Sequence, residues 1–232
     1  MSHWFTHQEQ AMLNAHLPHY FGYELLVLGE LHAKAAKKSP VSHHSAIVPE
    51  LLLGTEGAVA QWHQLPLVPD SVDIILAKHA IEQLEDPSAF LAEIHTTLRH
   101  DGYLLLCQFN AWHPQAHDVQ KKVVKPVTNE QGKLYAPGHL KNLLKAHGFE
   151  VVKTHRYGCQ VAMRHASGIP SKLQNLAYRM CPSLSLGYLM VAQKVDHCLT
   201  PIAPRKFWQN MLFSRKVMTQ SSCSNHEKRR QS

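Results

Sequence analysis

The sequence predicts an α/β fold built around an open, parallel sheet. Three observations predict it. Residues 65–110 contain a strand, a loop, a capped helix, a tight turn and a second strand, which together make one complete crossover unit. Further apolar runs that suit buried strands recur before and after this unit. No internal repeat is present. In such sheets ligands bind in the crevice beyond the carboxyl ends of the strands, so the same stretch also indicates where chemistry is expected.

The elements before this unit are predicted from apolar runs and from the proline and glycine residues that end them. A short helix is expected at 4–15, where it is ended by a segment containing Pro18. An apolar run at 23–29 that closes on a glycine has the pattern of a buried parallel strand. Weaker strand candidates lie at 45–48 and 58–62.

Inside the unit, residues 72–77 form the expected buried strand, launched by a turn at 69–71. The helix that follows begins at Asp86, a favourable N-cap, with Pro87 at its first position. Its apolar residues recur at helical spacing and define one packing face. The members of that face are Phe90, Leu91, Ile94 and Leu98. A turn at Asp101 and Gly102 then leads into a strand at 103–109.

Later elements are separated by two irregular regions, 110–136 and 157–186. Long segments without periodicity often serve as lids or substrate loops. Between them we expect a helix at 137–147 and a strand at 149–154, and after them a last strand at 188–193.

Composition places the chain among soluble, cytoplasmic proteins. It has 232 residues, of which 44% are hydrophobic and 18% charged, enough for one domain with a substantial core. We expect neither a membrane span nor a secretory signal. The five cysteines are odd in number and contain no CxxC, so reduced thiols are expected. The 19 histidines show no ligand set that would hold a metal, and none is expected.

The positive charge gathers at the carboxyl end. Residues 196–232 contain seven basic and two acidic side chains, which accounts for +5 of the net charge of +7. We therefore expect a domain at 1–195 and a basic, flexible tail at 196–232. The simplest role for the tail is to aid solubility. The alternative is salt-sensitive docking on nucleic acid.

Three segments of the chain together resemble the class I S-adenosylmethionine-dependent methyltransferases, in particular the type-11 methyltransferase domain family. They are the strand entry at 65–75, the segment His79 to Pro87, and the helix and strand from Phe90 to Leu104. The resemblance covers about residues 20–195. It implies a doubly wound, Rossmann-like methyltransferase fold with seven strands, mostly parallel, and an antiparallel last strand. It also implies S-adenosylmethionine as the cofactor.

The glycine-rich loop of that family is eroded in this sequence. Where the family places three glycines after the first strand, only Gly29 remains, and Leu31 and Ala33 carry side chains. Those glycines normally allow positive φ and a close approach of the backbone to the cofactor. Gln61 replaces an acidic residue that contacts the adenine in the family, although its amide can still hydrogen-bond the adenine edge.

The resemblance assigns roles to residues at the strand ends. Gly29 and Glu30 would lie under the methionine and ribose, and Glu50 would hold the ribose hydroxyls. The adenine would be lined by Gln61, Trp62 and His63, and the sulfonium and substrate would face Ala77, Lys78 and His79. The acceptor would be bordered by Asn110 and Trp112, and the two irregular regions would complete its pocket.

Alternatives stand beside several of these roles. His79 is the candidate catalytic base because imidazole titrates near neutrality, but a residue at this position of the family often only shapes the pocket. Trp62 can be a packing aromatic. Lys78 is unexpected beside a cationic cofactor and would suit an anionic substrate or a solvated surface position.

Two functions follow from the sequence. The first is an S-adenosylmethionine-dependent methyltransferase that acts on a small molecule. The second, favoured by the missing glycines, is a non-catalytic binding or regulatory protein that has kept the methyltransferase fold.

Overall fold

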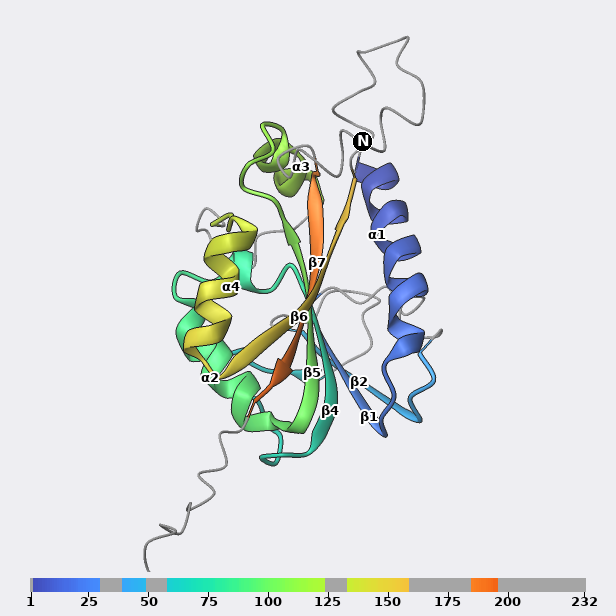
Figure 1. Cartoon of the computed structure of the whole chain (residues 1–232), viewed down its shortest axis with the longest axis vertical. Coiled ribbons are helices and arrows are strands. Elements are labelled where there is room, and N and C mark those ends of the chain that lie inside the picture. The colour runs from blue at the N-terminus through green and yellow to red at the C-terminus, as the bar shows by residue number, and fades with distance from the viewer. Residues whose placement is uncertain (1, 30–38, 49–57, 124–132, 159–184, 196–232) are drawn as a thin grey trace, which may run out of the picture. The chain divides into compact units, whose positions relative to one another are not determined.

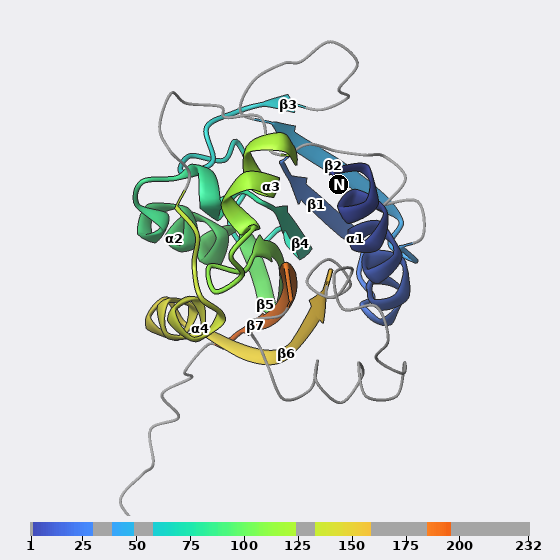
Figure 2. The same ribbon diagram turned by 90° about the horizontal axis from the view of Figure 1, so that it is seen from above.

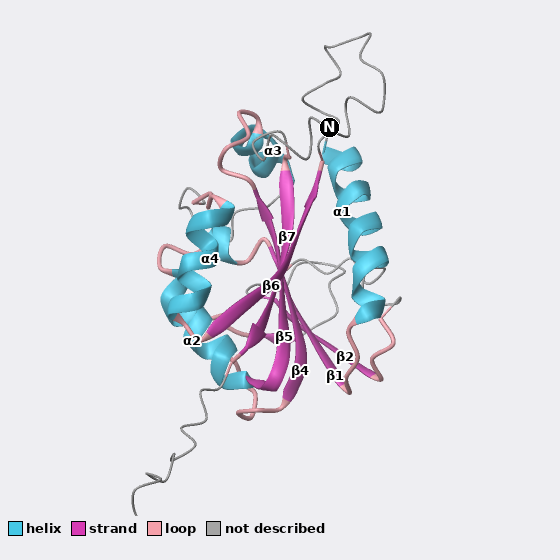
Figure 3. Ribbon diagram, viewed as in Figure 1, coloured by secondary structure: helices cyan, strands magenta, loops and turns pink. Residues whose placement is uncertain are grey.

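A computed structural model describes residues 2–29, 39–48, 58–123, 133–158 and 185–195. Its centre is a β-sheet, drawn in magenta in Figure 3. The sheet has seven strands in the order β3-β2-β1-β4-β5-β7-β6. The strands are β1 (Glu24–Leu28), β2 (His43–Val48), β3 (Ala58–Val59), β4 (Val72–Lys78), β5 (Leu98–Phe109), β6 (Phe149–Tyr157) and β7 (Gly187–Lys194). Neighbouring strands from β3 to β5 pair in parallel, whereas β7 runs antiparallel to both β5 and β6. The predicted sheet with an antiparallel last strand is confirmed.

Helices cover both faces of the sheet. One face carries α2 (Pro87–Thr97) and α4 (Pro137–Ala146), and the opposite face carries α1 (Ser2–His16), as Figures 1 and 2 show. A short helix, α3 (Ala116–Val123), follows β5 and lies inside the region that the sequence left irregular. The fold is thus doubly wound, as predicted. The described part of the chain contains no helix long and apolar enough to cross a membrane.

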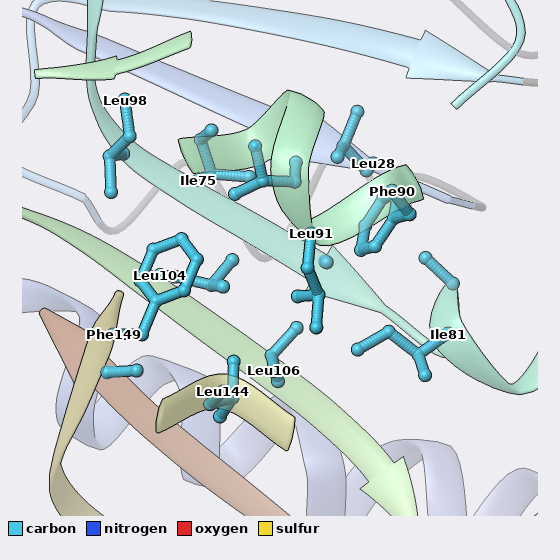
Figure 4. Close-up of a cluster of buried hydrophobic side chains, with 14 of the residues drawn as sticks. Leu28, Ile75, Ile81, Phe90, Leu91, Leu98, Leu104, Leu106, Leu144 and Phe149 are labelled. Atoms are coloured by element: carbon cyan, nitrogen blue, oxygen red, sulfur yellow. The ribbon is translucent and has the colours of Figure 1, made fainter. Parts of the chain in front are cut away.

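Local signals explain why the middle unit forms where it does. The Asp86 carboxylate accepts a hydrogen bond from the Ser88 backbone N–H at 2.9 Å, which makes it the N-cap of α2, as predicted. All four members of the predicted packing face of this segment are fully buried. In Figure 4, Phe90 and Leu91 of α2 meet Leu28 and Ile75 of the sheet.

Some predicted boundaries differ from the observed ones. The fifth strand begins at Leu98, earlier than predicted, because Leu98 pairs with Val72 before the register shifts and resumes at Tyr103. Asp101, at φ 59°, lies in this irregular part of the strand. At the edge of the sheet, β3 is only two residues long, shorter than the predicted 58–62.

The buried side of α1 has an unusual composition. The helix and the turn after it bury a single line of side chains, spaced four residues apart, formed by Phe5, Glu9, Leu13 and Leu17. Leu13 and Leu17 pack on the apolar residues of β1, β4 and β5. Glu9 is the one charged member of this line. Its carboxylate contacts Lys78 and His79 at the carboxyl end of β4.

Candidate functional site

A residue in a left-handed conformation and a group of buried charges lie at the carboxyl ends of β4 and β5. His79 comes directly after β4 and has φ 52°, a left-handed conformation that is uncommon for residues other than glycine. Its backbone N–H donates to the Cys107 carbonyl at 2.9 Å, which ties it to β5. Strained residues of this kind gather at active sites and ligand clamps.

Three donors converge on one buried carboxylate at this edge. Glu9 of α1 lies 2.8 Å from Lys78 Nζ and 2.9 Å from His79 Nε2. The Tyr157 hydroxyl donates to the same Glu9 oxygen as His79, at 3.1 Å. Glu9 is fully buried, His79 is 4% exposed and Lys78 is 14% exposed along their side chains. Donors from β4, the residue after it and the end of β6 therefore hold a carboxylate that α1 supplies.

A second carboxylate holds the other side of the same imidazole. Glu82 Oε1 lies 3.3 Å from His79 Nδ1 and accepts the Phe109 backbone N–H. Gln120 of α3 contacts the other Glu82 oxygen at 3.4 Å. His79 is thus fixed between two buried acids, one from α1 and one from the short 3-10 helix η3 (Ile81–Gln83).

The buried charges shift the pKa values of His79 and Glu9 in opposite directions. Burial by itself lowers the pKa of His79, but the charges of Glu9 and Glu82 outweigh it and raise this pKa to about 9. Burial raises the pKa of Glu9, but the cations of His79 and Lys78 outweigh it and lower this pKa to about 2. At neutral pH the cluster therefore contains an imidazolium and a carboxylate. In this arrangement His79 is already protonated, and its Nε2 faces Glu9.

Aromatic rings close the space beside the ion pairs. Phe5 of α1 stacks on Phe109 at 4.7 Å between ring centroids and lies 5.4 Å from the Tyr157 ring. The Phe109 ring stacks in turn on the His79 imidazole at 4.5 Å. Phe5 and Glu9, one helical turn apart on α1, therefore fill the volume next to the carboxyl ends of β4 and β5.

Gly29, the remaining glycine of the predicted cofactor loop, meets a strict backbone requirement. Its φ is +109°, and a Cβ at this position would lie 2.5 Å from the Lys78 carbonyl oxygen. The close approach that demands glycine here is therefore to the chain's own β4. The next cofactor candidates, Glu30 and Glu50, lie outside the described residues.

The predicted adenine residues divide between surface and core. Gln61 and His63 are exposed, whereas Trp62 is buried in the main core, 6.4 Å from the Phe90 ring. The Trp62 indole N–H is buried without a hydrogen-bond partner among the described residues. Two of the three predicted adenine residues, Gln61 and His63, are therefore open to a ligand, and the third, Trp62, is part of the core. Ala77, another candidate, is fully buried at the end of β4.

The predicted acceptor residues have structural partners. Asn110 is fully buried, and its amide nitrogen donates to the Ser185 carbonyl at 2.9 Å. Its amide oxygen accepts the Trp112 backbone N–H at 3.1 Å. Trp112 is 52% exposed. Asn110 thus fastens the segment after β5 to the start of β7, while the Trp112 side chain remains open to a ligand.

Sequence reasoning missed the acids of the site. Glu82, in the polar segment before α2, is fully buried, and its local sequence resembles that of a surface acid. Glu9 and Tyr157 were not singled out, although Glu9 interrupts an apolar line at helical spacing and this signal was available. In the described part of the chain no group of three potential ligands could hold a metal ion.

The chain belongs to a family of methyltransferase domains. The family model described as a methyltransferase domain, Methyltransf_23, matches residues 8–154, more than half of the chain. The predicted class, the class I S-adenosylmethionine-dependent methyltransferases, is confirmed, although the matching model is not the type-11 family that the motifs resemble. S-adenosylmethionine is the cofactor of this class.

Solved structures show the same fold at low sequence identity. One is a chain of the complex between the Haloferax volcanii Trm112 methyltransferase activator and a methyltransferase described as putative, with a TM-score of 0.61 and 15% identity. It covers 84% of this chain and 90% of that one. An S-adenosylmethionine-dependent methyltransferase from Archaeoglobus fulgidus has a TM-score of 0.60 and 16% identity, covering 80% and 93%.

A third structure, from Thermotoga maritima, is described as an S-adenosylmethionine-dependent methyltransferase and possible histamine N-methyltransferase. Its TM-score is 0.57 at 18% identity, with 83% of this chain and 91% of that one covered. At these identities the likeness establishes the fold alone. No curated protein matches the chain at a significant level.

Proposed function

We propose that this protein is an S-adenosylmethionine-dependent methyltransferase that acts on a small molecule in the cytoplasm. The observation that carries the proposal is the cluster of buried charges at the carboxyl ends of β4 and β5, in a chain that belongs to a methyltransferase family. Buried charges are costly, and they gather where a site needs them. The basic segment 196–232 is proposed as a tail outside the catalytic domain, which spans residues 1–195.

The cofactor supplies a methyl group already activated by the positive sulfur. The protein must then align the acceptor with that methyl group and exclude water. We assign the methionine and ribose to Gly29, Glu30 and Glu50. The adenine is assigned to Gln61, Trp62 and His63, at the side of the sheet where the unpaired indole N–H lies.

Ala77 and Lys78 are assigned to the sulfonium side, and Asn110 and Trp112 to the border of the acceptor. We keep His79 as the residue closest to the chemistry, with a role that depends on Glu9. While Glu9 binds Nε2, His79 is a fixed cation that orients groups around it. When Glu9 withdraws, the Nε2–H of His79 can bind and orient a group of the acceptor in its place.

Isothermal titration calorimetry with S-adenosylmethionine tests this function. We expect saturable binding to the full-length protein at micromolar to low millimolar cofactor, and competition by S-adenosylhomocysteine. Asp86→Ala, at the N-cap of α2, is the control and should bind equally. Absence of heat at millimolar cofactor in a correctly folded sample would reject the enzyme.

A second candidate function is a non-catalytic protein that has kept the fold. Phe5 and Glu9 favour it, because side chains of the protein itself fill the space beside His79. This candidate predicts no release of S-adenosylhomocysteine with any acceptor, even if the cofactor binds.

A further inference from the structure

Lys78, His79 and Tyr157 surround the Glu9 carboxylate as the residues of a carboxylate-binding site would. An ammonium, an imidazolium and a phenol reach one carboxylate within 3.1 Å, and these donors come from the end of β4, the residue after it and the end of β6 rather than from α1. Charge-assisted hydrogen bonds of this kind are short and strong, and a carboxylate can accept several at once.

Stability alone does not explain why the carboxylate is there. Glu9 lies between Phe5 and Leu13 in an otherwise apolar line. Replacing a buried ion cluster with well-packed apolar side chains is often neutral or stabilising, so a leucine in this line, with apolar partners, would serve the fold at least as well. The donors are therefore better explained by a ligand that needs them.

We propose that Lys78, His79 and Tyr157 bind the carboxylate of the acceptor, and that Glu9 of α1 occupies this site when the acceptor is absent. The identification of the ligand as an acceptor rests on the proposed function. The carboxylate site itself does not.

The neighbouring contacts narrow the class of ligand. Phe5 lies one helical turn from Glu9 and packs between Phe109 and Tyr157, so α1 presents an aromatic ring beside a carboxylate. A small carboxylic acid with an apolar or aromatic body would make the same contacts. Lys78 is the most exposed of the three donors, which gives a ligand its way in.

The exchange is balanced because one carboxylate replaces another on the same donors. Without Glu9, the Lys78 ammonium loses this carboxylate and His79 keeps only Glu82, which is costly for buried cations, so α1 gives up the site only to another anion. A neutral molecule of the same shape cannot replace the negative charge that Lys78 and His79 lose with Glu9. The structure therefore assigns selectivity for acids over their amides.

Two measurements without S-adenosylmethionine test the proposal. In the Glu9→Ala variant, propionate replaces the missing side chain, and we expect it to bind at least about tenfold more tightly than propionamide, since a charge-assisted bond is worth more than a neutral one. Adding Lys78→Met should remove most of this preference. Equal binding of the acid and the amide would overturn the carboxylate site.

The second measurement uses the wild-type protein, so it does not depend on the folding of a variant. Hydrogen exchange of residues 2–16 is followed with phenylacetate and with phenylacetamide. We expect faster exchange across α1 with the acid only, because it displaces Phe5 and Glu9. Unchanged exchange at saturating phenylacetate would overturn the displacement of α1. Because neither measurement contains the cofactor, a failure of methyl transfer stays distinguishable from a failure of this site.

Discussion

Replacing Glu9 with leucine lowers the free energy of unfolding by about 3–5 kcal/mol, since removing one partner of a buried ion cluster strands the others. His79, which is almost fully buried, then keeps only Glu82 as a counter-charge, and Tyr157 loses its acceptor. Urea denaturation at pH 6 measures the loss. His7→Leu, on the exposed side of the same helix, is the matched control and should change stability by less than about 0.5 kcal/mol.

The free energy of unfolding that Glu9→Leu removes should depend on pH. Because the pKa of Glu9 is lowered from 4.5 to about 2, its contribution is present above pH 4.5 and disappears as the pH falls toward 2. Because the pKa of His79 is raised from 6.5 to about 9, its contribution is present below pH 6.5 and disappears as the pH rises toward 9. The difference between wild type and Glu9→Leu should therefore be largest between pH 4.5 and 6.5. A difference that does not vary from pH 3 to pH 9 would show that the ion pairs do not contribute.

Replacing Gly29 with alanine should destabilise the protein by at least about 2 kcal/mol, because it combines backbone strain with a clash. A side chain is strained at φ +109°, and the added Cβ would lie 2.5 Å from the Lys78 carbonyl oxygen, a backbone atom that cannot turn away. Relief of the clash would move the end of β4, so binding of S-adenosylmethionine should weaken as well. Thermal unfolding and calorimetry measure the two effects.

Gly138→Ala is the matched control for this substitution. Gly138 lies in the first turn of α4, and a Cβ there would meet nothing within 4 Å. Alanine should stabilise this helix by about 0.5–1 kcal/mol. If Gly29→Ala is as harmless as the control, the close approach of β1 and β4 is not the reason for glycine.

Most of the fold could be predicted because local and global signals agree. The N-cap at Asp86, the apolar face of α2 and the buried runs of β1, β4 and β5 each specify an element without help from distant residues. The edges of the sheet were less predictable. Strand β3 is exposed and only two residues long, so its alternation carries little information.

The site was less predictable than the fold because its members are far apart in sequence. The segment 77–79 could be placed at a strand end from its position in the unit. Nothing in the sequence near Glu9 or Tyr157 indicates that they meet His79, since both contacts depend on how α1 and β6 pack. The protonation of His79 followed from the same packing and could not be read from the histidine alone.

We propose that the carboxyl ends of β1 and β4 hold the nucleoside of S-adenosylmethionine. A crystal structure of the full-length protein with S-adenosylhomocysteine tests it most directly. We predict the adenine beside Gln61 and Trp62 and the sulfur near Gly29 and Ala77. Density for the ligand at another edge of the sheet, or none at a saturating concentration, would contradict the account.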